Sequence, residues 1–361
     1  MTESLRSSCD TKVRPLPKVF VLELTKRCNH HCRYCYTVWG DPATGYEQHG
    51  NGEMPASEVR EMVSMLQDET PVESIALSDG DPLLREDLPE ILTFISDRGI
   101  APVIITNGTL LTSEKTAATM AGGNYETTLL SHRQEVHDQL CGRRGAWEAV
   151  VDGMANVHQA GGNMTAVFVA TKLNYMDLPT TAELALALGA RGLMYNRLNL
   201  GAHNLHEASR LLPTPEMIRE NLDTLEAIGK QNRLPIAVAV VIEPCVVDVR
   251  GYEHIHFGWC PLAEEDAYFT IDPAGNVRIC NHSPIVLGNL KQERFSNIYY
   301  KHPYVRSFRE TWPVECADCE PELKELCRGG CKAAAEQCYG TISRVDPFVT
   351  LSQRGQITPP A

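Results

Sequence analysis

The sequence lacks a membrane span, an export signal and an excess of positive charge. No apolar run approaches the length of about 20 residues that a membrane-crossing helix needs. The N-terminal stretch MTESLRSSCDTKVRPLPK contains no apolar core of the kind that a secretory signal carries. Lysine and arginine total 33 against 46 acidic residues, which gives a formal net charge of -13. We therefore expect a cytoplasmic protein that binds neither membrane nor nucleic acid, since nucleic-acid binding depends on neutralising phosphates.

A disulfide framework is also missing, although cysteine is abundant. The chain has 13 cysteines in 361 residues, an odd number in a sequence without an export signal. Such a set indicates reduced thiols or metal ligands rather than disulfides. Cys9 and Cys141 stand apart from the other cysteines and are interpreted as spare thiols. The hydrophobic content of 43% indicates a sizeable core, and the length allows one large domain and a smaller one.

Strand-like and helix-like segments alternate through the first two thirds of the chain. This alternation predicts parallel strands joined by right-handed crossovers. Six such repeats are too few for an eight-fold barrel, so we expect an α/β fold with an open, partial (β/α)6 TIM-like barrel; the alternative is a flat doubly wound sheet. The predicted strands are 19–24, 73–78, 102–106, 125–130, 164–170 and 192–196. The predicted helices are 56–67, 88–98, 113–121, 146–160, 178–188 and 215–230.

Each predicted strand leads into polar or glycine-containing residues. In α/β barrels the active site forms from loops at the carboxyl ends of the strands, so these residues are expected to meet at one rim. Asn, Gly and Asp are also common turn residues, which is the alternative for any single loop. In strand order the loops begin with three cysteines, Asp79-Gly80-Asp81-Pro82, Asn107-Gly108, Ser131-His132, Asn174 and Asn196-Arg197.

The first of these loops contains Cys28-x3-Cys32-x2-Cys35. Three thiolates can bind one face of a 4Fe–4S cluster and leave the fourth iron without a protein ligand, whereas an electron-transfer ferredoxin fills all four positions with cysteine. An open iron invites a small molecule. The alternative is a zinc site, which usually pairs two such ligands with a distant second pair.

This cysteine spacing, with Tyr36 directly after the third cysteine, resembles the radical S-adenosylmethionine (SAM) superfamily. The resemblance implies that SAM chelates the open iron and that one electron from the cluster splits SAM into methionine and a 5′-deoxyadenosyl radical, which then abstracts a substrate hydrogen atom. In the family the loop after the second strand usually is Gly-Gly-Glu-Pro and holds the SAM amino group. Here Asp79-Gly80-Asp81-Pro82 departs at two of the four places. Aspartate tolerates a positive φ better than most residues, so Asp79 can replace a glycine; a plain Asp-Pro turn is the alternative.

The resemblance implies further SAM contacts from later strand ends. A serine and a basic residue in the segment after the fourth strand often touch the SAM ribose and carboxylate in this family. The alternative for the two arginines is solvent-facing charge. His137 is interpreted as a packing histidine rather than a catalytic base. The candidates for these further contacts are Asn107, Ser131, Arg143, Arg144 and Asn196.

The composition shifts after an apolar run at 235–242, which is expected to end the barrel. Eight cysteines follow between Cys245 and Cys338, counting both. The stretch 267–280 predicts a hairpin around a turn at 272–276, because Pro and Gly there suit a tight turn between two alternating strands. The remaining cysteines follow the pattern Cys316-x2-Cys319-x7-Cys327-x3-Cys331-x6-Cys338.

This order of cysteines resembles the SPASM extension of the radical SAM superfamily, with x7 in place of the usual x5 between Cys319 and Cys327. The resemblance implies two auxiliary iron–sulfur clusters, predicted to be 4Fe–4S. The first cluster has no obvious fourth ligand: Asp266 and Cys245 are available, but an open or oxygen-ligated iron fits as well. The alternative for the later cysteines is structural zinc. The implied ligands are Cys260, Cys280 and Cys331 for the first cluster and Cys316, Cys319, Cys327 and Cys338 for the second.

Four segments follow from these patterns. Residues 1–18 are predicted to be a flexible lead, 19–242 the radical SAM partial barrel, 243–340 the SPASM auxiliary-cluster domain and 341–361 a C-terminal tail. The 18 residues of the lead are too few for a winged-helix peptide-recognition domain. A peptide substrate would then need a separate recognition protein or none.

The resemblance implies an oxidoreductase-type enzyme whose most common use is the maturation of a ribosomal peptide. A radical dehydrogenase or epimerase of a small sugar or aminocyclitol is the alternative, and a non-catalytic electron carrier is a third reading. The resemblance also implies a reducing electron donor of the flavodoxin or ferredoxin type. Sulfatase-maturating relatives carry an aspartate base directly after the hairpin cysteine, where this chain has Asn281, so that activity is not expected.

Overall fold

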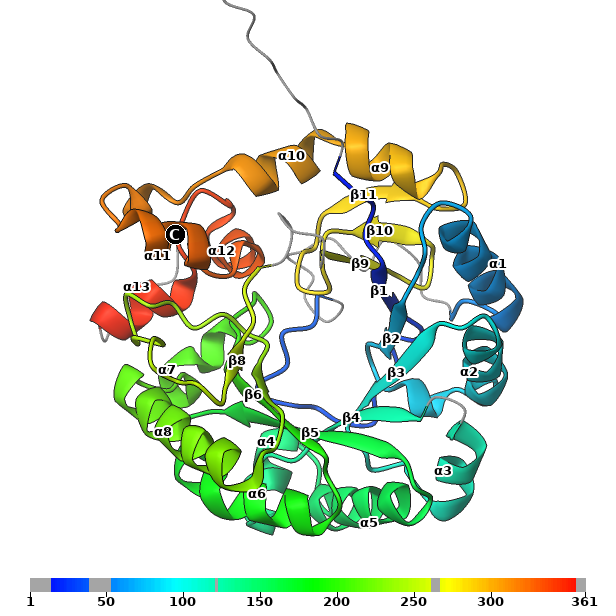
Figure 1. Cartoon of the computed structure of the whole chain (residues 1–361), viewed down its shortest axis with the longest axis horizontal. Helices are drawn as coiled ribbons and strands as arrows, with labels where there is room; N and C mark the ends of the chain where they lie inside the picture. Colours follow the sequence, from blue (N-terminus) through cyan, green and yellow to red (C-terminus); the bar gives the residue numbers. More distant parts are fainter. Residues whose placement is uncertain (1–13, 39–52, 121–122, 261–266, 355–361) are drawn as a thin grey trace, which may run out of the picture.

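The computed structural model describes residues 14–38, 53–120, 123–260 and 267–354. Within these residues one sheet of eleven strands runs in the order β11-β10-β9-β1-β2-β3-β4-β5-β6-β7-β8 (Figure 1). Neighbours from β1 to β8 pair in parallel. The strands are β1 Val19–Glu23, β2 Ser74–Ser78, β3 Ala101–Thr106, β4 Asn124–Thr128, β5 Asn163–Ala170, β6 Gly192–Arg197, β7 Ile236–Val238, β8 His256–Phe257, β9 Tyr268–Ile271, β10 Asn276–Arg278 and β11 Val286–Asn289.

Helices cover the outer face of this curved sheet (Figure 1). In α2, for example, Leu88, Ile91, Leu92 and Ile95 are buried, which is the spacing of one helix face packed on the strands. The helices are α1 Ala56–Gln67, α2 Leu88–Asp97, α3 Ser113–Thr119, α4 Gln134–Cys141, α5 Ala146–Gln159, α6 Leu178–Ala187, α7 Ala208–Leu211, α8 Pro215–Asn232, α9 Phe295–Lys301, α10 Pro303–Glu310, α11 Pro321–Cys327, α12 Lys332–Tyr339 and α13 Pro347–Arg354. In the described part of the chain no helix combines the length and the apolar character that a bilayer crossing requires.

The predicted partial barrel is confirmed, and the flat-sheet alternative is not needed. The six predicted strands and six predicted helices all occur, with ends that differ by a few residues. Helix α4 was not predicted, because its eight residues carry only a short apolar pattern. The prediction that the barrel ends with the run at 235–242 is wrong: only Ile236–Val238 pairs with β6, and β8 then pairs with β7. The end strands β8 and β11 lie at opposite edges of the sheet, so the barrel stays open.

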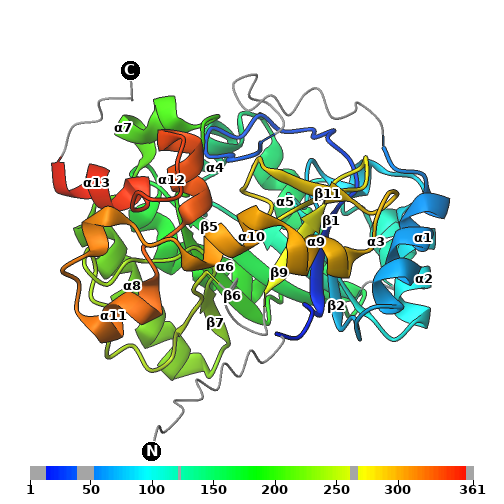
Figure 2. The same cartoon turned by 90° about the horizontal axis from the view of Figure 1, so that it is seen from above.

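The cysteine-rich region continues the barrel sheet. The predicted hairpin forms as β9 and β10, and β9 pairs in parallel with β1. Helix α9 lies across these strands (Figure 2), where Phe295 stacks edge-on against Phe20 and Phe269 at centroid distances of 5.1 and 5.3 Å. The two cysteine-rich parts of the chain are therefore joined through a shared sheet and core.

The ends of the predicted segments are more ordered than expected where they are described. The hydroxyl of Thr70 donates to the backbone carbonyl of Pro17 at 3.0 Å, within the predicted lead. The predicted C-terminal tail includes α13, and Asp346 before it is fully buried. Residues 341–354 therefore pack on the rest of the molecule. Cys9 and Asp266 lie outside the described residues.

Candidate active site

The loops after β2 and β3 form hydrogen bonds with the cysteine loop that follows β1. The backbone N–H of Asp81 donates to the carbonyl of Arg27 at 2.8 Å. The side-chain amide of Asn107 donates to Oδ1 of Asn29 at 2.8 Å, and Asn29 donates in turn to the hydroxyl of Thr109 at 3.1 Å. The convergence that the sequence predicted is present at these strand ends.

The far side of the same loop is held by the segment after β6. Arg33 donates to both carboxylate oxygens of Glu207, at 3.0 and 2.7 Å. The side-chain amide of Asn204 donates to the carbonyl of Tyr34 at 3.0 Å. Arg33, Asn204 and Glu207 were missed from the sequence, because the segment after β6 carries no motif that marks it. Contacts on both sides therefore fix the position of this loop and of its three cysteines.

The three loop cysteines lie close enough to influence one another. Burial, with a smaller contribution from the charge of Cys32, raises the pKa of Cys28 to about 11 and that of Cys35 to about 12. The thiols of Cys28 and Cys35 are therefore neutral in the bare protein, and a cluster must displace their protons to bind. A set of mutually close cysteines in one loop fits three thiolate ligands on one face of an iron–sulfur cluster.

Cys141 is not apart from the other cysteines, which corrects the prediction. Its sulfur, that of Cys32 and a ring nitrogen of His30 all lie within 4.8 Å of one another. The reason is local backbone pairing, since the N–H of His31 donates to the carbonyl of Cys141 at 3.1 Å. A hydrogen bond from the Cys141 thiol is the largest of the effects that lower the pKa of Cys32 to about 5.

The loop after β2 packs directly on the cysteine loop. Asp79, which replaces the first glycine of the family motif, has a positive φ of 65°, as predicted for that position. The φ of Gly80 is 53°. A Cβ on Gly80 would collide with the carbonyl of Arg27, so only glycine allows this approach. Burial raises the pKa of Asp79 to about 7, and among the described residues its Oδ2 has no hydrogen-bond partner.

The carboxylate of Asp81 is occupied within the protein. Its Oδ1 accepts from the N–H of Leu83 at 2.9 Å. Its Oδ2 accepts from the hydroxyl of Thr106 at 2.8 Å and from the N–H of Asn107 at 3.0 Å. Asp81 therefore ties the loops after β2 and β3 together, and of the two aspartates only Asp79 has an oxygen to offer.

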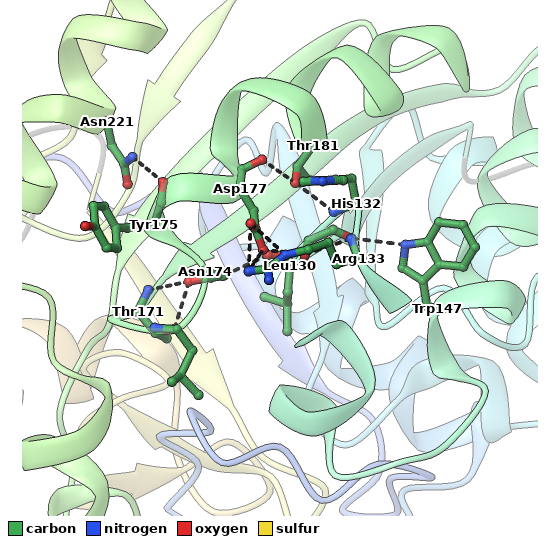
Figure 3. A network of polar contacts seen from close by, with 12 residues as sticks. Leu130, His132, Arg133, Trp147, Thr171, Asn174, Tyr175, Asp177, Thr181 and Asn221 are labelled. Atoms are coloured by element: carbon green, nitrogen blue, oxygen red, sulfur yellow. Dashed lines mark hydrogen bonds and ion pairs between the residues drawn. The ribbon is translucent and has the colours of Figure 1, made fainter. Parts of the chain in front are cut away.

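Polar residues after β4 and β5 bind each other in a buried network (Figure 3). The hydroxyl of Ser131 donates to Asp177 at 2.6 Å, and Arg133 donates to both oxygens of the same carboxylate. The side-chain amide of Asn174 donates to the carbonyls of Leu130 and Val169 at 2.7 and 3.0 Å. Ser131 thus serves to position these loops in the bare protein, and its predicted contact with SAM stays a prediction.

The remaining candidates fall in three different places. Arg143 donates to the carbonyl of Asn29 at 3.3 Å and so reaches the cysteine loop, whereas Arg144 is exposed, as the solvent-facing alternative expected. Oδ1 of Asn196 accepts from the N–H groups of Ala239 and Val240, both at 3.1 Å, and joins β6 to the segment after β7. His137 is a packing histidine, as predicted.

The three cysteines predicted for the first auxiliary cluster come together. Burial raises the pKa of Cys331 most, and the charges of Asp346, Cys280 and Cys260 raise it further. The side-chain amide of Asn199 lies 3.9 Å from the Cys331 sulfur as a hydrogen-bond donor. Asn199 carries no motif that would have predicted this contact, apart from its place just past the end of β6.

This first auxiliary site adjoins the cysteine loop. Glu23 at the end of β1 forms a buried ion pair with Arg278 of the hairpin. The amide of Asn281 donates to the hydroxyl of Tyr36 at 2.9 Å. This contact fixes the side chain of Asn281. Asn281 stands where sulfatase-maturating relatives carry an aspartate base, so sulfatase maturation is still not expected.

The cysteines predicted for the second auxiliary cluster divide into two groups. The charges of Cys316 and Cys319 interact with each other. Cys338 lies apart on α12, and burial together with Asp346 raises its pKa to about 12. In the described residues the group at Cys141 is the only set of three or more His, Cys, Asp or Glu residues whose ligand atoms all lie within 4.8 Å of one another. A tetrahedral zinc site needs sulfurs about 3.8 Å apart, so a wider cluster fits these thiols better than one zinc ion.

An open parallel barrel with a triad of cysteines at its rim and further cysteines beside it defines an iron–sulfur enzyme. The radical SAM superfamily model matches residues 22–185, and the iron-sulfur cluster-binding domain called SPASM matches residues 260–320. The chain therefore belongs to the radical SAM superfamily and to its SPASM branch. Its cofactors are SAM and iron–sulfur clusters.

Similar proteins agree with this assignment along nearly the whole chain. The Fe-coproporphyrin III synthase of Methanosarcina barkeri is 25% identical, over 93% of this chain and 88% of its own. The PqqA peptide cyclase of Rhodopseudomonas palustris is 26% identical, again over 93% and 88%. The structure of Streptococcus suis SuiB bound to S-adenosylmethionine superposes with a TM-score of 0.70 at 14% identity, over 91% of this chain and 76% of that one. At that identity SuiB supports the fold alone.

Proposed function

We propose that this chain is a radical SAM enzyme of peptide maturation that abstracts a hydrogen atom from its substrate. The observation that carries the proposal is the position of Cys28, Cys32 and Cys35. They lie on one loop at the carboxyl ends of the strands, and the loops after β2, β3 and β6 hold it. In α/β barrels this rim is the site of catalysis.

In this proposal Cys28, Cys32 and Cys35 bind the cluster that SAM completes, and Asp79 binds the SAM amino group. The unpartnered Oδ2 of Asp79 supports that assignment, because a buried carboxylate oxygen without a donor is costly unless a ligand supplies one. When bound, the cluster and SAM supply an electron and a 5′-deoxyadenosyl radical that takes hydrogen from an unactivated C–H bond. The contacts that clamp the loop keep the cluster position fixed.

The auxiliary sites are proposed to carry a second electron away from, or back to, the substrate. Cys260, Cys280 and Cys331 form the first site, next to the SAM site through Tyr36 and the hairpin. We further propose that the protein acts in the cytoplasm and that a flavodoxin or ferredoxin supplies the initial electron. A separate peptide-recognition protein remains part of the proposal for a peptide substrate.

The similarity to a PqqA peptide cyclase supports a peptide as the substrate. Similarity of the same strength to an Fe-coproporphyrin III synthase makes an iron porphyrin the second candidate. The small sugar or aminocyclitol stays a prediction from the sequence.

Deuterium transfer separates these substrates. Anaerobic, reconstituted protein is incubated with SAM, dithionite and one deuterated candidate at a time: a precursor peptide, an iron porphyrin or an aminocyclitol. We expect deuterium to enter 5′-deoxyadenosine only with the peptide. Transfer from the porphyrin or the aminocyclitol, with none from peptides, would assign the alternative substrate class.

A further inference from the structure

Two glycines between Cys327 and Cys331 hold three separate parts of the chain together. A Cβ on Gly330 would collide with the carboxylate of Glu243, and a Cβ on Gly329 would collide with the ring of Pro313. The backbone φ is 84° at Gly329 and 79° at Gly330, values that residues other than glycine rarely adopt. The glycine pair therefore brings the segment after β7 and the segment before Cys316 against the turn that carries Cys327.

The segment after β7 carries Cys245. Glu243 is buried and anchored by Arg197 at 3.1 Å, and its carbonyl accepts from the N–H groups of Val246 and Val247 at 2.8 and 3.0 Å. This tight turn fixes the position of Cys245, which lies two residues after Glu243, the residue that contacts Gly330. Further along, Arg250 lies near enough to Glu320 and Glu322 for their charges to act on it. The whole segment thus runs beside the chain between Cys316 and Cys327.

Cys245 lies near enough to the thiols of this neighbouring segment for their charges to interact. Its charge interacts with those of Cys316 and Cys319, and it also acts on Cys327. Four thiols from three segments therefore surround one region. Their sulfurs do not meet the 4.8 Å spacing found around Cys141, so the region suits a cluster rather than a single ion.

Cys338 does not belong to this group. Its side chain is 3% exposed and packs in the apolar core from α12. Burial and the charge of Asp346 raise the pKa of Cys338.

We propose that Cys245 is the fourth thiolate ligand of the second auxiliary cluster, together with Cys316, Cys319 and Cys327, and that Cys338 is a core thiol. This inference rests on the auxiliary-cluster part of the proposed function and replaces the ligand that the family pattern implies. Cys245 is exposed, so the cluster would lie at the surface, where an electron donor can approach it.

Thiol labelling tests the inference in the native protein. The anaerobic holoprotein and the same protein stripped of iron by a chelator are treated with iodoacetamide, and labelling of Cys245 is followed by mass spectrometry. Because Cys245 is exposed, only a bond to the cluster should protect it, and we expect labelling to be at least about tenfold slower in the holoprotein. Equal labelling rates in the two forms overturn the proposal.

Iron content supplies the matched comparison. We expect Cys245→Ala to lose about four iron atoms per chain and Cys338→Ala to keep them, because only the former removes a cluster ligand. Retention of iron by Cys245→Ala with loss from Cys338→Ala overturns the proposal. Cys316→Ala is measured alongside: if it also keeps all its iron, the second cluster itself is absent, and the auxiliary part of the proposed function fails instead.

Discussion

Tyr36 and His282 lie in contact, with ring centroids 4.7 Å apart. Tyr36 follows the last cysteine of the SAM loop, and His282 follows Cys280 of the first auxiliary site by two residues. The imidazole is itself fixed, because its Nε2 lies 2.9 Å from the carbonyl of Leu200. One aromatic pair therefore bridges the two proposed cluster sites.

Loss of the Tyr36 ring should separate these two sites. We expect Tyr36→Ala to lower the free energy of unfolding by roughly 2 kcal/mol, since a partly buried ring and its contact with His282 are removed. Tyr36→Phe keeps the ring and loses only the hydrogen bond from Asn281, which should cost about 1 kcal/mol. Urea unfolding of the anaerobic holoproteins measures both. Equal costs for the two variants would show that the ring contact contributes nothing.

The ion pair between Arg33 and Glu207 should slow the loss of iron from the SAM cluster. Arg33→Lys cannot make both hydrogen bonds, so the loop will open more often. We expect iron release to a chelator to become several-fold faster, followed anaerobically by absorbance. Arg306→Lys is the control, because Arg306 pairs with Glu310 on the exposed surface of α10, away from the loop. The idea is wrong if both variants release iron at the rate of the unmodified protein.

The Cys141 thiol should tune the SAM cluster without binding it. Hydrogen bonds to cluster sulfurs raise the reduction potential, so Cys141→Ala should keep its iron and shift the potential of the cluster to a more negative value. A redox titration followed by electron paramagnetic resonance measures the shift. An unchanged potential, or loss of the cluster, contradicts this role.

His137 should make the protein less stable in mild acid. Its Nδ1 accepts from the N–H of Leu130 at 3.2 Å, and burial lowers its pKa from 6.5 to about 4. The unfolded chain therefore binds a proton that the folded chain excludes, so stability falls as the pH drops from about 6.5 towards 4, by up to about 3 kcal/mol. His137→Asn keeps an acceptor without the titration. Unfolding curves between these pH values should be flatter for this variant, and equal slopes would rule out His137 as the cause.

The periodic parts of the fold followed from the sequence, and so did the cysteine loop. Helix α1 lies at its predicted bounds, because its apolar spacing alone fixes the face that it buries. Local spacing also marked the three loop cysteines, since all of them lie within one loop. The same kind of pattern predicted the hairpin of β9 and β10, although not its pairing with β1.

Contacts between distant segments could not be predicted from spacing. Cys141 is placed beside Cys32 by backbone pairing across the fold, which no interval in the sequence records. Asp79 and Asp81 looked interchangeable, and only the structure separates them, because Thr106 and Asn107 occupy the carboxylate of Asp81. Cys338 fitted the expected order of cysteines, yet burial on α12 sets it apart from Cys316 and Cys319.

Reductive cleavage of SAM by variants of the three loop cysteines is the most direct measurement. Anaerobic protein, SAM and dithionite are combined, and 5′-deoxyadenosine is measured by mass spectrometry. We predict none above background for Cys28→Ala, Cys32→Ala and Cys35→Ala, whereas Cys319→Ala should still cleave SAM and be impaired mainly in turnover of its substrate. Formation of 5′-deoxyadenosine by a variant that lacks all three loop cysteines would contradict the assignment of this loop as the SAM centre.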